Sequence, residues 1–461
     1  MTGPYRLGND MATRGILARV VATALGVASY VLVAPPAASA GDGAISLGPV
    51  SATPQSFDLA AAQGVLAMQR LDGWLLYDYQ GQNPVAVAVA RPVRPLRYRW
   101  FLLIPARGEP TVLVHRTDLK AIPHLSARVV EYAGWKDLDS GLRQLLKGKR
   151  RIAMEYFAGG ALPEVSRVDA GTLERVKGMG VEVVSSAELA QAVASRWGKE
   201  GRVSHYVAVH NLVAIRNEVL AHVAGRLASV PASVAAGTTA GTIDSREGPT
   251  EQEVQQLIVN AFVDRGLESE VPPVVASGPN TADPHHAPSD RPLQRGDLVL
   301  ITVAAKQAGV SGAIYAKLTW VVYLGDEVPA RYQHAFAAVA KARDEVVALV
   351  AERSKGGRAV KGWEADKVAR DSLQASGHGG LLMHPTGHSL DARAHGAGAN
   401  LDGFEVQDSR NLLVDAGFVI EPGVYYAKDF GLRSAVSCHV VPGGLAITTP
   451  VQSEILPLLA R

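Results

Sequence analysis

The sequence has a single cysteine, Cys438, among 461 residues, and it lacks an excess of either charge, with 46 basic and 44 acidic side chains. One cysteine excludes an internal disulfide, so a packed hydrophobic core must hold the fold. Low-complexity tracts and short-period repeats are also lacking, which excludes fibrous and solenoid classes. With 47% hydrophobic and 20% charged residues, the composition is that of a globular protein, and the length predicts two or three domains.

Long apolar runs are absent outside the N-terminus, so no later segment is predicted to span a bilayer. The one apolar stretch covers residues 20–33; Arg14 and Arg19 precede it, and the Ala-Ser-Ala pattern of residues 38–40 follows it. This order is typical of a cleavable export signal. The stretch is short for a membrane span and is followed by two prolines, so cleavage is favoured over a retained anchor, which stays the alternative.

We therefore predict a signal peptide over residues 1–40, cleaved after Ala40, then a leader over residues 41–55 and a periplasmic or secreted mature chain. Cleavage removes three arginines and one aspartate, which leaves 43 basic and 43 acidic residues and a formal charge of zero. A neutral chain lacks the electrostatic footprint for nucleic acid or anionic lipid. Nucleic-acid partners and, after signal removal, membrane partners are excluded on this ground.

Residues 56–200 alternate between helix-like and strand-like segments, which predicts an α/β domain. Ser56 is the predicted cap of a first helix that runs to Arg70. Arg107 and Gly108 are the predicted turn of a hairpin. Strands are predicted at residues 74–77, 100–104, 111–114, 152–154 and 181–184.

Residues 201–461 are predicted to form a second domain that begins with a long amphipathic helix, because apolar residues recur there at three- and four-residue steps. Thr250 and Glu253 form a capping box at the start of another helix. The Gly-rich last 80 residues suit a curved antiparallel sheet. The predicted fold class is thus α+β, with an N-terminal α/β domain and a C-terminal sheet that carries two helix pairs. The supporting segments are the apolar helix positions Leu212, Ile215, Val219, Val223 and Leu227, strands at residues 298–301 and 320–323, and helices over residues 332–350 and 363–376.

Four motifs in the second domain point to a known family. They are Val275-Ala276-Ser277-Gly278-Pro279-Asn280 with Pro284-His285, Arg295-Gly296-Asp297, Pro385-Thr386-Gly387-His388-Ser389 and Ile420-Glu421-Pro422-Gly423. With these motifs, in this order, residues 56–455 resemble the creatinase, prolidase and methionine aminopeptidase superfamily, peptidase family M24. The chain is most similar to exported Xaa-Pro peptidase-like proteins. The resemblance implies a creatinase-type N-terminal domain and a C-terminal pita-bread domain.

Active members of this family hold a pair of Mn, Co or Zn ions with Asp, Asp, His, Glu and Glu. The first Asp lies in a strand that reads Leu-Ile-Asp-x-x-x-Lys, and the matching residues 300–306 place Thr302 at the ligand position. The second Asp lies in Tyr-Ala-Asp-Ile-Thr-Trp, and the matching residues 315–320 place Lys317 there. Both aspartates are therefore replaced.

The other three ligand positions are partly kept. His388 stands at the place of the histidine and Glu421 at the place of the first glutamate, whereas Ala435 follows Gly-x-Arg-Ser where the last glutamate belongs. Two divalent ions need several negative oxygen ligands to offset their charge and lost hydration. One carboxylate, one imidazole and one hydroxyl do not supply them. We therefore expect a vestigial metal site with no bound metal and no cofactor.

Lys317 decides this expectation, because its ammonium would lie where a cation belongs. Two unit positive charges about 4 Å apart repel by about 4 kcal/mol at an effective dielectric of 20, and a divalent ion is repelled more. Glu421 would otherwise be buried without a counter-charge, so we predict an ion pair between Lys317 and Glu421. The alternative is a lysine that points into solvent. His388 is then expected to be a core histidine held by hydrogen bonds.

The resemblance also implies roles for residues around this site. His285 and His395 match residues that line the substrate pocket of relatives, and Arg433 is the third candidate for substrate binding. If the protein is active, His285 and Glu421 are the candidate catalytic residues. The remaining candidates, His286, His384 and His439, are expected to be surface or filler residues.

Three functions remain open from the sequence. The first is a pseudopeptidase that binds a peptide, a small ligand or a partner without hydrolysing it, because the metal that generates the nucleophile is lost. The second is a metal-independent hydrolase of the creatinase type, in which a histidine at the place of His285 and a glutamate at the place of Glu421 act without metal. The third is residual Xaa-Pro peptidase activity with one weakly held ion. Because members of the family are commonly dimers, the resemblance leaves a homodimer open.

Overall fold

The computed structural model describes residues 58–228 and 248–460. The predicted signal peptide, the leader and Ser56 lie outside the described residues, so export stays a prediction. The first described helix, α1 (Leu59–Met68), is capped by Asp58, whose side chain accepts a hydrogen bond from the Ala61 amide. Among the helices that the structure describes, none combines the length and apolarity that a membrane crossing requires.

A six-stranded sheet organises the N-terminal part of the described chain, with strand order β4-β3-β2-β1-β5-β6. β2 runs antiparallel to its neighbours β1 and β3, and the remaining pairs are parallel. The predicted hairpin is confirmed, and Gly108 in its turn has a φ of 98°, which favours glycine. The strands are β1 (Gly73–Asp78), β2 (Trp100–Pro105), β3 (Thr111–His115), β4 (Arg128–Tyr132), β5 (Arg151–Met154) and β6 (Glu182–Ser185).

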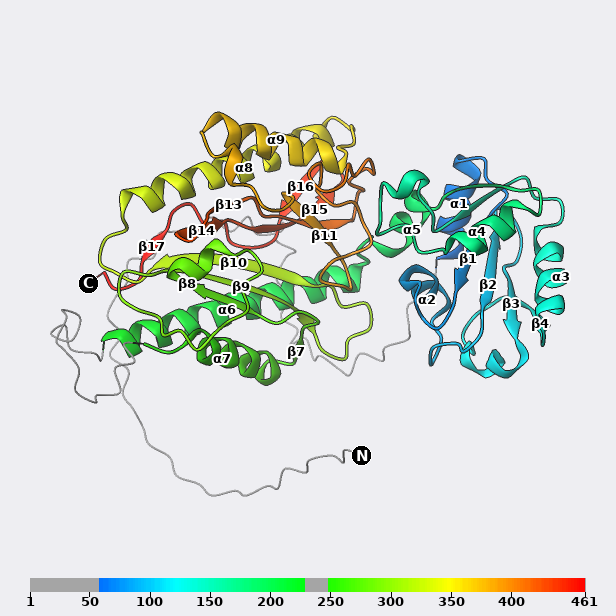
Figure 1. Ribbon diagram of the computed structural model, residues 1–461, viewed down its shortest axis with the longest axis horizontal. Helices are drawn as coiled ribbons and strands as arrows, with labels where there is room; N and C mark the ends of the chain where they lie inside the picture. Colours follow the sequence, from blue (N-terminus) through cyan, green and yellow to red (C-terminus); the bar gives the residue numbers. More distant parts are fainter. Residues whose placement is uncertain (1–57, 229–247, 461) are drawn as a thin grey trace, which may run out of the picture. The chain divides into compact units, whose positions relative to one another are not determined.

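Helices cover both faces of this sheet (Figure 1). Along β1, Trp74 and Leu76 pack in one hydrophobic cluster, and Leu75 and Tyr77 pack in another on the opposite face. This two-residue alternation is the pattern of a strand buried on both sides. The helices are α2 (Pro84–Ala90), α3 (Trp135–Leu146), α4 (Ala170–Lys177) and α5 (Ala187–Ala194), with short 3-10 turns η1 (Arg116–Ala121) and η2 (Ala158–Gly160).

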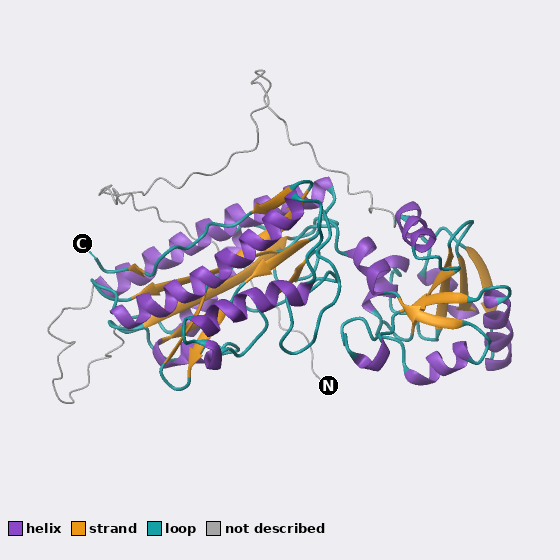
Figure 2. Cartoon of the chain, turned by 90° about the horizontal axis from the view of Figure 1, so that it is seen from above, coloured by secondary structure: helices purple, strands orange, loops and turns teal. Residues whose placement is uncertain are grey.

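The C-terminal part carries two helix pairs on a set of mainly antiparallel strands, as predicted. The helices are α6 (Lys199–Ala228), α7 (Glu251–Asp264), α8 (Ala330–Lys355) and α9 (Gly362–Ala375). Figure 1 shows α6 and α7 on one side of the strands and α8 and α9 on the other, and Figure 2 shows the long helices running alongside the strands. Each pair packs on its own hydrophobic cluster.

Three groups of strands lie between the helix pairs. The first group is β7 (Leu267–Glu268), β8 (Val274–Ser277), β9 (Leu298–Gln307), β10 (Ala316–Tyr323) and β17 (Leu456–Pro457). The second group is β11 (Gly387–Leu390), β12 (Gly417–Ile420), β15 (Val436–Val441) and β16 (Gly444–Ile447), and the third is β13 (Gly423–Tyr426) with β14 (Phe430–Arg433). The 3-10 turn η4 (Gly278–Ala282) lies between β8 and β9, and η5 (Gly379–Leu381) lies between α9 and β11. The division of the chain near residue 200 stays a prediction.

The predicted capping box at the start of α7 is confirmed. The Thr250 hydroxyl accepts a hydrogen bond from the Glu253 amide at 3.1 Å, and the Glu253 carboxylate accepts one from the Thr250 amide at 2.8 Å. These bonds satisfy two backbone donors that a helix start leaves without partners.

Removing the Thr250 cap is expected to destabilise the fold, and chemical denaturation measures the change in the free energy of unfolding. We expect Thr250→Ala to lower the free energy of unfolding by about 1 kcal/mol. Thr250→Ser, which keeps the hydroxyl, is expected to change it by less than about half of that amount. Equal losses in both variants would assign the effect to packing of the Thr250 methyl group instead.

Candidate functional site

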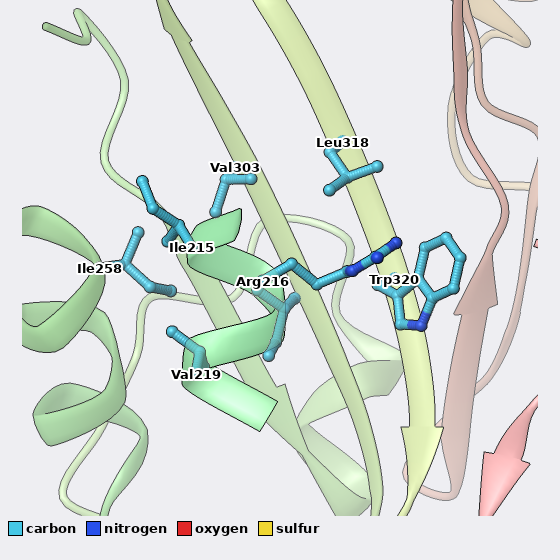
Figure 3. A pocket seen from close by; sticks show the side chains of 8 residues that line it. Ile215, Arg216, Val219, Ile258, Val303, Leu318 and Trp320 are labelled. Carbon is cyan, nitrogen blue, oxygen red and sulfur yellow. The ribbon is translucent and has the colours of Figure 1, made fainter. Parts of the chain in front are cut away.

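The candidate site lies on the face of β9 and β10 that points away from α6, which is called the inner face below. Val303, Leu318 and Trp320 point from these strands toward α6, as Figure 3 shows, and pack in the cluster beneath that helix. Because side chains alternate along a strand, Thr302 and Lys317 lie on the opposite face. The sequence therefore places core residues and site residues at neighbouring positions.

On the face of β9 and β10 that packs against α6, the Arg216 guanidinium stacks on the Trp320 ring. The guanidinium carbon of Arg216 lies 4.1 Å from the centre of the Trp320 ring. The cavity that remains beside it is about 10 Å³ (Figure 3), which is room for about one water molecule. This cavity is a packing gap and not a ligand site.

On the inner face, Lys317 lies at the centre of the site. Its Nζ atom lies 2.6 Å from Glu421 Oε1 and 2.9 Å from His388 Nε2, and all three side chains are buried. Lys317 comes from the start of β10, His388 from β11, and Glu421 directly follows β12. The predicted ion pair is therefore present, and the alternative of a solvent-exposed lysine is wrong.

The hydrogen bonds define the protonation of His388. An ammonium group has no lone pair, so Lys317 donates to Nε2 of His388, and Nδ1 of the same ring donates to the Ser389 carbonyl oxygen at 3.0 Å. Burial and the adjacent Lys317 ammonium lower the pKa of His388, which keeps the ring neutral. His388 is thus the hydrogen-bonded core histidine that the sequence predicted.

Charge balance in the site centres on Glu421. Burial alone would raise the pKa of Glu421, but the Lys317 ammonium and the Arg433 guanidinium outweigh burial and hold this pKa well below its usual range. For Lys317, burial lowers the pKa because it disfavours the charged ammonium, and the Glu421 carboxylate opposes that effect. We treat the two as an ion pair at neutral pH, because separating them would leave each charge buried without a partner.

Arg433 links the ion pair to Thr302. Its Nη1 atom lies 3.9 Å from Glu421 Oε2, and its Nη2 atom donates to the Thr302 hydroxyl at 3.0 Å. The Thr302 hydroxyl also lies 2.9 Å from that of Thr319, the residue opposite it in the β9–β10 ladder. Two polar atoms here, Glu421 Oε2 and Arg433 Nε, are buried and make no hydrogen bond with any residue of the described chain.

These side chains do not fit a pair of divalent ions. The Lys317 ammonium already takes the lone pairs of His388 and Glu421 that an ion would need. Thr302 is engaged by Arg433, and Ala435 is a buried methyl group that packs near Trp197. Over residues 58–228 and 248–460, the structure contains no cluster of three or more His, Cys, Asp or Glu side chains placed to hold a metal ion.

The two histidines predicted to bind substrate differ in their contacts with the site. His395 stacks on the His388 ring, with centroids 3.9 Å apart and an interplanar angle of 17°, and its side chain is exposed. His285 is also exposed, and its backbone amide bonds to the Asp283 carboxylate. Within the described chain, no hydrogen bond or ring contact joins the His285 side chain to Glu421. His395 thus connects the buried site to solvent.

Expectations for two other histidines were wrong. His384 was expected at the surface or as filler, but its Nε2 lies 2.7 Å from the Tyr425 hydroxyl next to the site, and burial together with Arg433 lowers its pKa to about 4. His286 bonds to the buried Glu251 carboxylate at 2.7 Å. His439 is buried against Trp197, which agrees with filler.

Tyr425 itself was not predicted. Burial raises its pKa to about 12, so its hydroxyl remains protonated beside Arg433 and Glu421. The position of His384, four residues before His388 and adjacent to the same Pro-Thr-Gly motif, was the one sequence signal that linked this pair to the site.

Comparisons with known proteins agree with this architecture. Residues 228–442 match the model of metallopeptidase family M24. The probable dipeptidase PepE of Mycobacterium tuberculosis is 28% identical over 186 residues, which are 40% of this chain and 46% of that protein. The Xaa-Pro dipeptidase of Pyrococcus furiosus is 26% identical over 217 residues, which are 46% of this chain and 56% of that protein. The chain thus spans about half the length of the curated relatives it matches.

Solved structures match over more of the chain. Dipeptidase PepE from Mycobacterium ulcerans superposes with a TM-score of 0.65 at 22% identity, covering 87% of this chain and 96% of that one. The prolidase from Thermococcus sibiricus gives 0.60 at 19% identity, covering 87% and 98%. At such identities the likeness concerns the fold alone, and the predicted fold class is confirmed.

Proposed function

From the match of residues 228–442 to the model of metallopeptidase family M24, we propose that the protein is an exported, metal-free pseudopeptidase of that family. One observation carries the proposal: a lysine ammonium lies 2.6 Å from Glu421 and 2.9 Å from His388, the two residues that the resemblance places among the metal ligands. The internal cation takes the place of the bound ones. The protein is then a binding protein built on a peptidase fold.

The chemical reason for inactivity is the loss of the nucleophile. A catalytic metal lowers the pKa of bound water and polarises the carbonyl group that the resulting hydroxide attacks. Lys317 supplies positive charge, but its three protons point outward from a saturated nitrogen, so it cannot bind and ionise a water molecule as a metal does. Charge is retained at the site while the source of hydroxide is lost.

A ligand with both a hydrogen-bond donor and an acceptor would suit the retained polar groups. Glu421 Oε2 is a buried acceptor and Arg433 Nε a buried donor, and both are without hydrogen-bond partners among the residues described. Buried polar atoms of this kind are costly unless they find a partner. A peptide bond offers both groups, and exposed His395 lies beside the site. We therefore propose a peptide or a small polar molecule as the ligand.

The two other functions have less support. A creatinase-type mechanism requires His285 to act together with Glu421, whereas the His285 side chain is exposed and makes no hydrogen bond or ion pair with that carboxylate in the described chain. Residual metallopeptidase activity requires His388 and Glu421 to hold an ion that Lys317 repels. Both functions remain as outcomes of the experiment that follows.

Metal analysis and a hydrolysis assay test the proposal. We expect the purified mature protein to contain less than about a tenth of an equivalent of Mn, Co or Zn, and to show no hydrolysis of Xaa-Pro dipeptides with added Mn²⁺ or Co²⁺, because the ligand set is deficient. Stoichiometric metal with turnover would overturn the proposal. Turnover that persists in chelator and disappears in His285→Ala would instead select the creatinase-type function.

A further inference from the structure

A large cavity lies in the N-terminal α/β domain, far along the chain from the site described above. Its volume is about 690 Å³, within the range of about 300–1,000 Å³ that is typical of small-molecule sites. Six aromatic or imidazole side chains line it, together with two arginines. They are Tyr77, Tyr79, Tyr98, His115, Tyr132 and Trp135, with Arg99 and Arg175.

The topology of the sheet explains why these residues meet. β1, β3 and β4 run in one direction, and their carboxyl ends contribute Tyr77, His115 and Tyr132 to the cavity. β2 runs the opposite way, so the residues just before it, Tyr98 and Arg99, lie at the same edge. Ligands of open α/β sheets bind at this edge of the strands.

The aromatic side chains form a partly exposed stacking surface. Tyr98 and His115 stack with centroids 4.0 Å apart, and His115 meets Tyr132 edge-on at 5.1 Å. Tyr79, Tyr98 and Trp135 are 42%, 46% and 68% exposed. Exposed aromatic rings gathered around one concave surface are unusual for a structural role and typical of a binding site.

The cavity is lined by two cationic side chains, Arg99 and Arg175, and one anionic side chain, Asp169. Arg99 is half-buried, and its guanidinium makes no hydrogen bond or ion pair with any described residue. Arg175 is paired with Asp139 at 3.2 Å, and Asp169 is occupied in capping α4 through the Thr172 amide at 2.8 Å. Arg99 is therefore the cationic side chain of this lining that has no direct hydrogen-bond or ion-pair partner among the described residues.

We propose that this cavity binds a planar aromatic anion, meaning an aromatic or heteroaromatic ring that carries a carboxylate or phosphate group. The anionic group pairs with the Arg99 guanidinium, whose planar fork of N–H donors can bond two oxygen atoms of either anion. The ring packs on Tyr98 and its aromatic neighbours through offset stacking. The proposal is independent of the function proposed for the site around Lys317.

Titration calorimetry on the mature protein tests the proposal with phenyl phosphate and benzoate as probes. Inorganic phosphate and phenol, each carrying one half of the recognised chemistry, are the reference ligands. We expect at least one probe to bind at least about tenfold more tightly than either reference, because ring and anion act together. Tight binding of phenyl phosphate alone assigns a phosphorylated ligand, and tight binding of benzoate assigns a carboxylate.

Two matched variants localise the binding. Arg99→Met is expected to weaken the preferred probe at least about tenfold, through loss of a charge-assisted hydrogen bond. Arg97→Met removes an exposed arginine that does not line the cavity and is expected to leave the affinity unchanged. Circular dichroism and thermal melts establish that both variants fold. Absence of binding by both probes, or equal weakening in the two variants, would overturn the proposal.

Discussion

Replacing Lys317 by methionine is expected to lower the free energy of unfolding at pH 7 by about 3 kcal/mol, because the buried Glu421 carboxylate loses its ammonium partner and keeps the neutral His388 ring at 3.2 Å and the Arg433 guanidinium at 3.9 Å. Methionine has a similar length, so the loss of charge dominates over the loss of packing. Urea denaturation measures the difference. Lys341→Met serves as the control, because Lys341 is 65% exposed on α8 and such surface changes stay within about 0.5 kcal/mol.

The loss should depend on pH in a direction that the pKa of Glu421 defines. In the wild type this pKa is lowered, so its stabilising effect is present at neutral pH and is lost only as pH falls through the folded value, well below the ordinary 4.5. In Lys317→Met, the ammonium that offsets burial is gone, so the pKa of Glu421 rises relative to that of the wild type, although Arg433 still lowers it. The carboxyl group of the variant therefore takes up a proton at a higher pH than in the wild type, and the deficit of the variant should shrink as pH falls.

A double variant distinguishes the contribution of the Lys317–Glu421 charges from the contribution of side-chain packing. Lys317→Met combined with Glu421→Gln removes both charges, and replacing a buried pair completely is often close to neutral. We expect the double variant to recover most of the stability that Lys317→Met loses. If the double variant is as unstable as the sum of the two single variants, the two residues do not act as a pair.

Restoring the carboxylate ligands of the family should turn the site into one that binds metal ions. The triple variant Thr302→Asp, Lys317→Asp and Ala435→Glu provides four carboxylates around His388, the ligand set of the active family. We expect it to be less stable than the wild type without metal, because the carboxylates repel one another and the longer side chain at position 435 must displace the neighbours of a buried alanine. Added Mn²⁺ should then stabilise it by about 2.7 kcal/mol at a hundredfold excess over the dissociation constant.

The melting temperature as a function of Mn²⁺ concentration measures this gain. The wild type should show no shift, and a variant with Thr302→Asp and Ala435→Glu that keeps Lys317 should show little, because the ammonium still occupies the site. A strong metal-dependent shift in the variant that keeps Lys317 would contradict the role assigned to that side chain. Enzymatic activity is not needed for this test.

Local sequence signals predicted much of the fold. The capping box at Thr250 and the apolar steps from Leu212 to Leu227 depend on contacts three or four residues apart, which a sequence displays directly. The Lys317–Glu421 pair, 104 residues apart, was predictable for a different reason. The family motifs placed both residues at one site, and the cost of a buried unpaired charge favoured their pairing.

Other features were beyond local signals. The His384–Tyr425 hydrogen bond joins residues 41 positions apart, and no motif marked Tyr425. The cavity around Arg99 takes its lining from several loops at one edge of a sheet, so its existence depends on strand order and direction. These are tertiary facts, and propensities do not encode them.

The alternation of side chains along β9 and β10 has a consequence for how such a protein can change. Val303 and Leu318 belong to the interior beneath α6, while their immediate neighbours Thr302 and Lys317 face away from it. Exchanges at every second position therefore change the chemistry of the site and leave the apolar layer beneath α6 unchanged. The cost in stability of such exchanges arises among the buried polar groups of the opposite face.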